Sequence, residues 1–343
     1  MEKAHHIILY YMFILVFLLL TSSPSFAIIL HPEGEPNLAI WTDKPANSVV
    51  GRWSTNASFV VISPKWIITT RHQNTCPTTL TINNVTYNCT YNSENWTGGS
   101  SANADLRLIR LKNLDGSDPN LAYAPPYQDT NEVGKYFCIG GYGKYRGDTL
   151  SSGFLKPKPY GYTWAGTSNN TLRWGDNTIE DEDTTQTASY DSNTLSSDFD
   201  ETGTDYEAAP ALWDSGGGWF IKQNDIWKLA ALSAYVQRYE TWFDDPNQPG
   251  QNPDFFWGIR ISSYAEWINS IIVPDCNESV RGDLNSNCMV NFSDFAIIAI
   301  QWLSMDCGIE NNFCYGADSE PDNDVDIIDL SVLIEHWLFD TSL

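Results

Sequence analysis

The sequence predicts a mostly β main region, residues 28–274, followed by a small α-helical domain, residues 275–343. Short runs of β-branched and aromatic residues, separated by Gly, Asn, Pro and Asp, fill the first region, which is typical of an all-β barrel or sandwich. The second region contains a repeat with a period of 35 residues, in which an acidic loop precedes each of two apolar segments. The 343 residues, 42% hydrophobic, exclude a disordered or fibrous chain.

The first residues have the pattern of a secretory signal peptide. An apolar run of 14 residues, 7–20, follows Lys3, and small residues (Ser25, Ala27) precede a cut after Ala27. A membrane anchor is the alternative, but the run is shorter than the roughly 20 residues that span a bilayer. We expect an exported protein, extracellular, at the cell surface or periplasmic, without a transmembrane anchor.

The main region offers four clear strand candidates and one helix. We expect strands at 59–62, 66–70, 106–111 and 227–232. A helix is expected at 262–272, with Pro274 after it.

Two segments carry the formal net charge of −24. Residues 176–207 contain 11 acidic residues and no Lys or Arg, and residues 275–343 contain 14 acidic residues and one Arg. Nucleic acid is disfavoured as a partner, because neutralising phosphates needs a basic face. We expect 176–207 to be a solvated loop, with a calcium site or an electrostatic filter as alternatives.

Seven cysteines in an exported protein permit disulfides. Cys76 and Cys89 are close enough in sequence to close a local loop. Four cysteines near the C-terminus allow two further bridges: Cys276, Cys288, Cys307 and Cys314. Cys138 lies in an apolar run and is expected to be a buried thiol.

Each copy of the repeat contains a twelve-residue loop with oxygen-bearing side chains at positions 1, 3, 5, 9 and 12. In the first copy these are Asp283, Asn285, Asn287, Asn291 and Asp294, and in the second Asp318, Glu320, Asp322, Asp326 and Asp329. Position 7, which donates a backbone carbonyl, is Met289 or Asp324. Such ligands at alternate positions suit Ca²⁺. A solvated acidic tail with helix caps is the alternative, but two in-phase loops favour two calcium sites.

Positions 6 and 8 of the loops refine this prediction. Cys288 and Asn323 stand at position 6, where Gly is usual. Because Asn tolerates a left-handed backbone better than Cys does, the first site is expected to be the looser one. The apolar Val290 and Val325 at position 8 would let the loops pack together.

On these loops the tail, residues 281–339, resembles a dockerin domain. The resemblance implies calcium-dependent binding to a cohesin module on a scaffold or cell-surface protein. In this family loop positions 10 and 11 contact cohesin, and here they are Phe292-Ser293 and Ile327-Ile328.

Three motifs of the main region point to nucleophilic catalysis. Residues 58–72 read SFVVISPKWIITTRH, residues 104–111 ADLRLIRL and residues 213–218 WDSGGG. A nucleophilic serine needs a base and a carboxylate that orients the base. His72, Asp105 and Ser215 could supply these roles in that chain order.

The same motifs resemble those of trypsin/chymotrypsin-like serine peptidases over most of residues 45–272. The resemblance implies two six-stranded antiparallel barrels with the site between them. Ser215 would be the nucleophile, His72 the general base and Asp105 its orienting partner. The backbone N–H groups of Trp213 and Ser215 would form the oxyanion hole.

The chain departs from the family pattern at three places. Arg71 replaces the Ala before the histidine, and Gln73 and Ala57 replace a disulfide-bonded pair. Trp213 replaces a Gly at the oxyanion-hole peptide, whose conformation is easier without a side chain. A catalytically inactive barrel used for binding therefore stays open as an alternative, and an ester hydrolase is a third.

The resemblance also implies a substrate pocket and an activation step. Ala209 occupies the position that sets pocket charge in the family, and Ser233 belongs to the same pocket. Without a carboxylate there, small or apolar residues are the expected substrates. Signal removal would expose the amine of Ile28, which in this family pairs with the Asp before the serine, here Asp214.

Overall fold

The computed structural model describes residues 28–31, 41–54, 57–73, 77–93, 103–166, 171–187, 189–247, 253–272, 281–284, 289–308 and 311–338. The predicted signal peptide (1–27), Cys76, Cys276, Cys288 and the first-loop residues Asn285 and Asn287 lie outside these ranges. The chain forms two compact units, Met1–Ala265 and Glu266–Leu343. The expected boundary after residue 274 falls outside the described residues.

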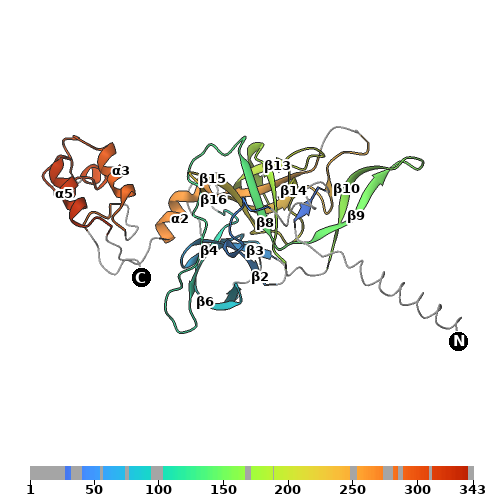
Figure 1. Cartoon of the computed structure of the whole chain (residues 1–343), viewed down its shortest axis with the longest axis horizontal. Coiled ribbons are helices and arrows are strands. Elements are labelled where there is room, and N and C mark those ends of the chain that lie inside the picture. Colours follow the sequence, from blue (N-terminus) through green and yellow to red (C-terminus); the bar gives the residue numbers. More distant parts are fainter. Residues whose placement is uncertain are drawn as a thin grey trace, which may run out of the picture. The chain divides into compact units, whose positions relative to one another are not determined.

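A six-stranded antiparallel sheet forms the first half of unit 1 (Figure 1). Its strands are β2 (Val50–Trp53), β3 (Ala57–Ser63), β4 (Trp66–Thr69), β5 (Thr79–Ile82), β6 (Val85–Ser93) and β7 (Arg107–Lys112), in the order β2-β3-β4-β7-β6-β5. The edge strands β2 and β5 lie next to each other, so the sheet curls into a nearly closed barrel.

A seven-stranded antiparallel sheet forms the second half. Its strands are β8 (Tyr136–Gly141), β11 (Arg173–Thr178), β12 (Asp181–Gln186), β13 (Asp191–Asp198), β15 (Gly218–Gln223), β16 (Ile226–Val236) and β18 (Phe255–Arg260), in the order β11-β8-β15-β16-β18-β13-β12. The edge strands β11 and β12 follow each other in the chain, joined by residues 179–180. The predicted mostly β region is confirmed, with one sheet of six strands and one of seven.

Strand β3 shows why the two sheets pack together. Residues 57–62 are all buried, so the strand lacks the polar alternation of a solvent-facing sheet. Phe59 and Val61 pack inside the first barrel. Ser58 of the same strand donates its backbone N–H to the carbonyl of Ser215 over 2.9 Å, and its side-chain oxygen accepts the N–H of Tyr142 over 2.9 Å. The core of the second sheet is aromatic, with Phe137 and Trp219 stacked at 4.6 Å.

Smaller elements complete unit 1. β1 (Ile29–Leu30) pairs with β14 (Ala208–Ala209), and β10 (Lys158–Ala165) pairs with both β9 (Tyr145–Ser152) and β17 (Thr241–Trp242). Two 3₁₀ turns, η2 (Asn47–Val49) and η3 (Ser262–Tyr264), are present, and η3 leads into α2 (Ala265–Ile272), which belongs to unit 2 from Glu266 onward. The four predicted strands and the predicted helix at 262–272 are confirmed.

The prediction of a solvated loop at 176–207 is wrong. The segment contributes to β11 and forms β12 and β13. Ser192, Thr194 and Leu195 of β13 are buried, whereas β12 is an almost wholly exposed edge strand. Charged edge strands resist pairing with other chains. Asp181, Glu182 and Asp183 therefore lie on an exposed sheet edge, whereas Asp176 and Glu207 are buried.

Unit 2 contains α3 (Phe292–Ile300), the short α4 (Asn312–Tyr315) and α5 (Ile327–Glu335). A helix follows each of the two predicted loops, and residues 285–288 of the first loop lie outside the described residues. Each long helix begins with a capping box, formed by Asn291 and Asp294 in α3 and by Asp326 and Asp329 in α5. Cys307 and Cys314 form one of the two bridges allowed by the sequence.

The two copies bond to each other reciprocally. The N–H of Leu338, after the second helix, donates to the carbonyl of Val290 in the first loop over 2.8 Å. The N–H of Leu303, after the first helix, donates to the carbonyl of Val325 in the second loop over 2.9 Å. Val290 and Val325 are fully buried, as expected for position 8.

Candidate active site

His72 and Asp105 come together because β4 and β7 are antiparallel neighbours. Thr69, at the end of β4, pairs with Arg107, at the start of β7. The turn after β4 and the loop before β7 therefore lie at the same end of the sheet. Nδ1 of His72 is 2.5 Å from Oδ2 of Asp105, and the backbone N–H of His72 donates to Oδ1 over 2.7 Å. Asp105 is fully buried, whereas the His72 side chain is 31% exposed.

Ser215 lies in the turn before β15, tied to both sheets. Its carbonyl accepts the N–H of Ser58, and the N–H of Gly216 donates to the carbonyl of Ser233 over 2.9 Å. Gly216 has φ of +80°, and a Cβ there would lie 2.2 Å from the carbonyl oxygen of Ser58. Only glycine suits this approach of the turn to β3. The serine loop is thus fixed at the junction of the two sheets.

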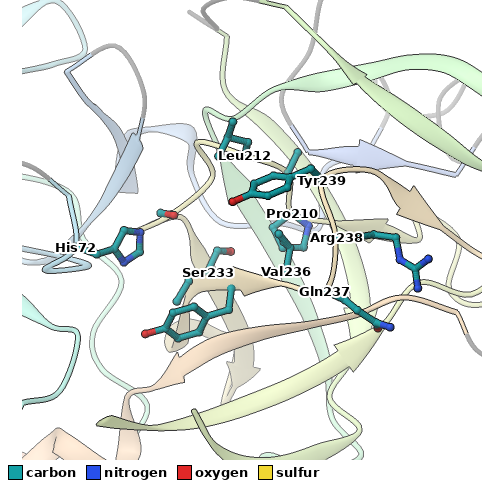
Figure 2. Close-up of a pocket in the computed structure, with 12 residues that line it drawn as sticks. His72, Pro210, Leu212, Ser233, Val236, Gln237, Arg238 and Tyr239 are labelled. Atoms are coloured by element: carbon teal, nitrogen blue, oxygen red, sulfur yellow. The ribbon is translucent and has the colours of Figure 1, made fainter. Parts of the chain in front are cut away.

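Ser215 and His72 both line a cleft of about 330 Å³, which Figure 2 shows. Within the described part of the chain, Nε2 of His72 contacts the side-chain amide of Gln73 at 3.1 Å, and no hydrogen bond joins it to the Ser215 hydroxyl. The buried Gln73 amide also donates to Thr70 Oγ1 over 3.2 Å. Sequence reasoning noted Gln73 only as the loss of a disulfide partner.

Trp213, one of the two predicted oxyanion-hole residues, has an uncommon backbone conformation. Trp213 has φ of +80°, a left-handed conformation rarely adopted by bulky residues. The Lys144 ammonium lies 5.2 Å from the centre of its ring, a cation–π contact that helps to hold it. Among the described residues, the N–H groups of Trp213 and Ser215 donate no hydrogen bond within the protein.

Asp214 is fully buried beside Ile28. Its carboxylate accepts the backbone N–H groups of Gly143 (2.7 Å), Ala211 (2.9 Å) and Ile28. Burial raises the pKa of Asp214 to about 7, although these hydrogen bonds and the charge of Arg173 oppose the shift. Ile28, the first residue after the predicted cut, is fully buried as well. The structure therefore brings the two predicted activation partners together.

The two predicted pocket residues are placed differently. Ser233 lines the cleft and accepts a hydrogen bond from Trp219 Nε1 over 2.9 Å. Ala209 is not among the described lining residues, and it is buried in the hydrophobic core of the second sheet. Its neighbours Pro210 and Ala211 line the cleft instead.

One arginine, Arg238, lines the side of the cleft away from His72. Arg238 lies on the opposite side of the view from His72 in Figure 2. Its Nε is 2.7 Å from Oδ1 of Asp254, and its guanidinium stacks 3.8 Å above the Trp242 ring. No Asp or Glu is found among the described lining residues.

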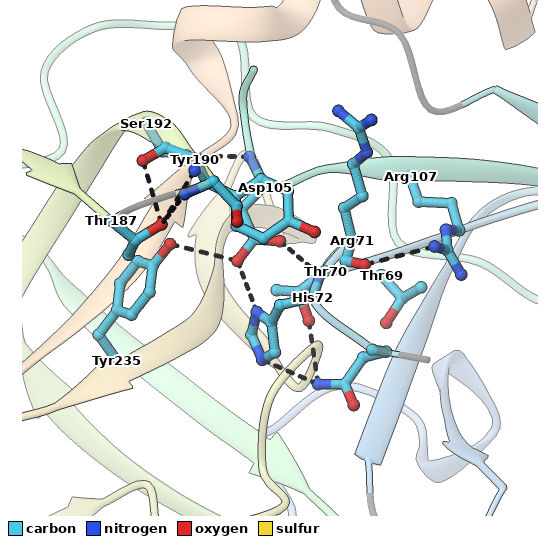
Figure 3. A network of polar contacts seen from close by, with 12 residues as sticks. Thr69, Thr70, Arg71, His72, Asp105, Arg107, Thr187, Tyr190, Ser192 and Tyr235 are labelled. Atoms are coloured by element: carbon cyan, nitrogen blue, oxygen red, sulfur yellow. Dashed lines mark hydrogen bonds and ion pairs between the residues drawn. The ribbon is translucent and has the colours of Figure 1, made fainter. Parts of the chain in front are cut away.

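Tyr235 is a site residue that sequence reasoning missed. Its hydroxyl donates to Asp105 Oδ2 over 3.2 Å, as Figure 3 shows. It belongs to none of the three motifs, and its contact with Asp105 joins residues that are 130 positions apart in the sequence. No local pattern could have revealed it.

In unit 2, a carboxylate of the second loop accepts hydrogen bonds from the backbone of the same loop. Asp318 Oδ1 and Oδ2 accept the N–H groups of Asp322 and Asn323, each over 3.3 Å. Asn323, at loop position 6, has φ of +82°, as its residue type allows. Burial and the charges of Asp329 and Asp322 raise the pKa of Asp318. Oδ1 of Asp324 is buried without a hydrogen-bond partner. These oxygens have the hard-donor chemistry of a calcium loop.

Three acidic residues of unit 1 form a cluster. Carboxylate oxygens of Glu180, Asp198 and Asp200 come within 4.8 Å of one another. Burial and the charges of Asp200 and Glu180 raise the pKa of Asp198 to about 7.

Cys138, predicted to be a buried thiol, is indeed buried, and burial raises its pKa. Within the described residues, no helix is long and apolar enough to cross a membrane.

Comparison with solved structures finds a similarity to neuropsin, a serine protease expressed in the limbic system of mouse brain. The sequence identity is 14% and the TM-score is 0.41, over 65% of this chain and 94% of the neuropsin chain. No protein-family model matches the chain, and no curated protein matches it.

Proposed function

We propose that this chain is an exported serine endopeptidase of trypsin-like fold that uses Ser215, His72 and Asp105. The observation that carries the proposal is the 2.5 Å contact between His72 Nδ1 and Asp105 Oδ2, beside a cleft that Ser215 also lines. A carboxylate at Nδ1 holds the proton on that nitrogen, which leaves the lone pair of Nε2 directed away from Asp105. This is the tautomer that a general base needs.

In the proposed reaction, Nε2 of His72 takes the proton of Ser215 as Oγ forms a bond to the substrate carbonyl carbon. The carbonyl oxygen becomes an oxyanion, which the N–H groups of Trp213 and Ser215 stabilise. Collapse breaks the C–N bond, and His72 returns the proton to the leaving amine. Water then attacks the acyl group with His72 as base, which releases the acid and regenerates Ser215.

The cleft favours small or apolar substrate side chains. A basic side chain would find no carboxylate among the described lining residues. Arg238 is engaged by Asp254 and Trp242, which lowers its capacity to bind an acidic side chain. Substrates with Ala, Val or Leu before the cleaved bond should therefore be better than those with Lys or Arg.

The test is fluorophosphonate labelling of the mature full-length chain. Labelling should be lost by more than about 10³-fold in Ser215→Ala and in His72→Ala, because the nucleophile and its base act as one unit. Ser117→Ala, at an exposed turn, is the matched control and should label normally. Circular dichroism establishes that each variant folds.

A non-catalytic binding module is the second candidate, and the contact between Gln73 and Nε2 of His72 favours it. A folded wild-type chain that never labels would support this candidate, because a base occupied by Gln73 does not activate Ser215. Labelling that survives in His72→Ala would also contradict the triad.

We further propose that unit 2 is a dockerin that binds two Ca²⁺ and tethers the enzyme to a cohesin module. In the second loop Asp318, Asp322, Asp324 and Asp329 would contribute ligands, and their shared negative charge supports a cation there. The exposed side chains of Phe292, Ile327 and Ile328 support a protein-binding role for the helix starts.

Calorimetric titration of the chelator-treated full chain with CaCl₂ tests the calcium proposal. Two equivalents should bind to the wild type and one to Asp318→Ala. Asp225→Ala, an exposed carboxylate of unit 1, is the control. A stoichiometry unaffected by Asp318→Ala would contradict the assignment.

A further inference from the structure

Tyr235 joins the cleft to the buried carboxylate behind it. The residue lies near the end of β16, where the pairing with β18 shifts register between Ser233 and Tyr235. Its side chain lines the cleft, and its hydroxyl lies 3.2 Å from Oδ2 of Asp105. The Tyr235 and His72 rings are 6.3 Å apart, with 32° between their planes. One side chain thus contacts Asp105 and flanks the imidazole.

Asp105 is held from both sheets. Oδ1 accepts the backbone N–H of His72, and Oδ2 is shared between His72 Nδ1 and the Tyr235 hydroxyl. The backbone N–H of Asp105 donates to Ser192 Oγ over 2.9 Å. Asp105 precedes a strand of the six-stranded sheet, whereas Tyr235 and Ser192 belong to the seven-stranded sheet. Figure 3 shows this convergence on Asp105.

We propose that Tyr235 is a positioning residue, which holds the Asp105 carboxylate in line with Nδ1 of His72. The inference rests on the proposed function. Through its O–H donor, Tyr235 fixes the rotation of the carboxylate and shares its negative charge, and through its ring it limits the movement of the imidazole. Fixing the partner of the base within a fraction of an ångström is what a preorganised site requires.

The hydroxyl acts as a donor only. Burial and the charge of Asp105 raise the pKa of Tyr235 well above its ordinary value, so the phenol keeps its proton throughout the working range. A hydrogen bond donated to a charged acceptor is stronger than one between neutral groups. Tyr235 is therefore suited to orienting Asp105 and not to proton transfer with substrate.

Tyr235→Phe in the mature full-length chain tests the proposal, because it deletes the hydroxyl and keeps the ring. We expect kcat for a peptide substrate to fall about 3- to 10-fold, the loss of one hydrogen bond, with KM changed less than twofold. We also expect the downfield NMR resonance of the His72 Nδ1 proton to move further downfield. Oδ2, relieved of its second donor, becomes a stronger acceptor for that proton. Tyr123→Phe, an exposed tyrosine, should change neither quantity.

The outcomes separate this inference from the proposed function. An unmoved resonance with unchanged kcat would overturn it, and so would a raised KM with unchanged kcat, which would assign Tyr235 to substrate binding alone. A wild type that does not label, with a resonance that moves in Tyr235→Phe, would refute the hydrolase and keep the positioning role. Tyr235→Leu removes the ring too, and should lower kcat further than Tyr235→Phe.

Discussion

The side-chain amide of Gln73 lies 3.1 Å from Nε2 of His72, the nitrogen that would receive the proton of Ser215 in the proposed reaction. With the Nδ1 proton donated to Asp105, Nε2 is an acceptor and the amide of Gln73 is its donor. Nε2 of the proposed base is thus already hydrogen-bonded to Gln73, the next residue in the chain. The proposed catalysis would require this bond to break or to be exchanged for a bond to Ser215.

Gln73→Leu should therefore label faster with fluorophosphonate than the wild type. A net hydrogen bond of about 0.5–1.5 kcal/mol corresponds to a rate increase of roughly 2- to 10-fold. Labelling reactions quenched at a series of times, at a fixed reagent concentration, give the two labelling rates. Thr70→Val, which removes the other partner of the Gln73 amide but keeps the bond to His72, serves as control. Slower labelling in Gln73→Leu would show that Gln73 supports the base.

Trp213 should respond differently to Gly and to Ala. Both substitutions remove the cation–π contact with Lys144, but only Gly relieves the left-handed backbone at φ of +80°. We expect Trp213→Gly to be more stable than Trp213→Ala by about 1 kcal/mol. Urea unfolding measures the difference, and labelling should persist in Trp213→Gly. Equal stabilities would mean that the backbone relaxes when the indole is lost.

The free energy of unfolding should fall as pH rises from about 5 to 8. Burial is the main cause that raises the pKa of Asp198 and Asp214 to about 7 and that of Glu207 to about 8. Between their ordinary values near 4 and these raised values, the folded chain binds more protons than the unfolded chain. Stability is therefore lost as pH rises through this window.

Thermal unfolding of the full chain at pH 5 and pH 8, followed by circular dichroism with a calcium chelator present, checks this expectation. The midpoint should be lower at pH 8. The decrease should be smaller in Asp198→Asn, which removes one of these titrations. A midpoint that rises toward pH 8 would contradict the assignment of these carboxyls as protonated in the folded state.

A mature chain that begins at Ile28 should label at least about tenfold faster than one that begins at Ala27. One extra residue moves the amine by about 3.8 Å, the spacing of consecutive Cα atoms. The ammonium then no longer reaches Asp214, whose carboxylate is left with N–H donors alone. The Ile28 chain acetylated at its amine is the control and should behave like the extended chain. Equal labelling of all three forms would exclude this activation step.

Local patterns sufficed for much of the fold and site. The buried runs around Phe59, Ile67 and Leu108 are strands because β-branched and large apolar residues suit a covered sheet. His72, Asp105 and Ser215 could be singled out because each lies in its own short motif. The strands in 176–207 were missed because the prediction gave the acidic residues more weight than the Thr, Ser and Leu residues between them, and β12 tolerates charge as an exposed edge. Tyr235 was missed because its partner is set by how two sheets pack.

The reciprocal bonds between Leu338 and Val290 and between Leu303 and Val325 link the two acidic loops of unit 2. Each loop is closed by the end of the helix that follows the other loop, so neither copy is a complete module. An ion that orders one loop also orders the residues that close its twin. The two loops should consequently fill cooperatively, with a Hill coefficient above one, and a single copy expressed alone should bind weakly.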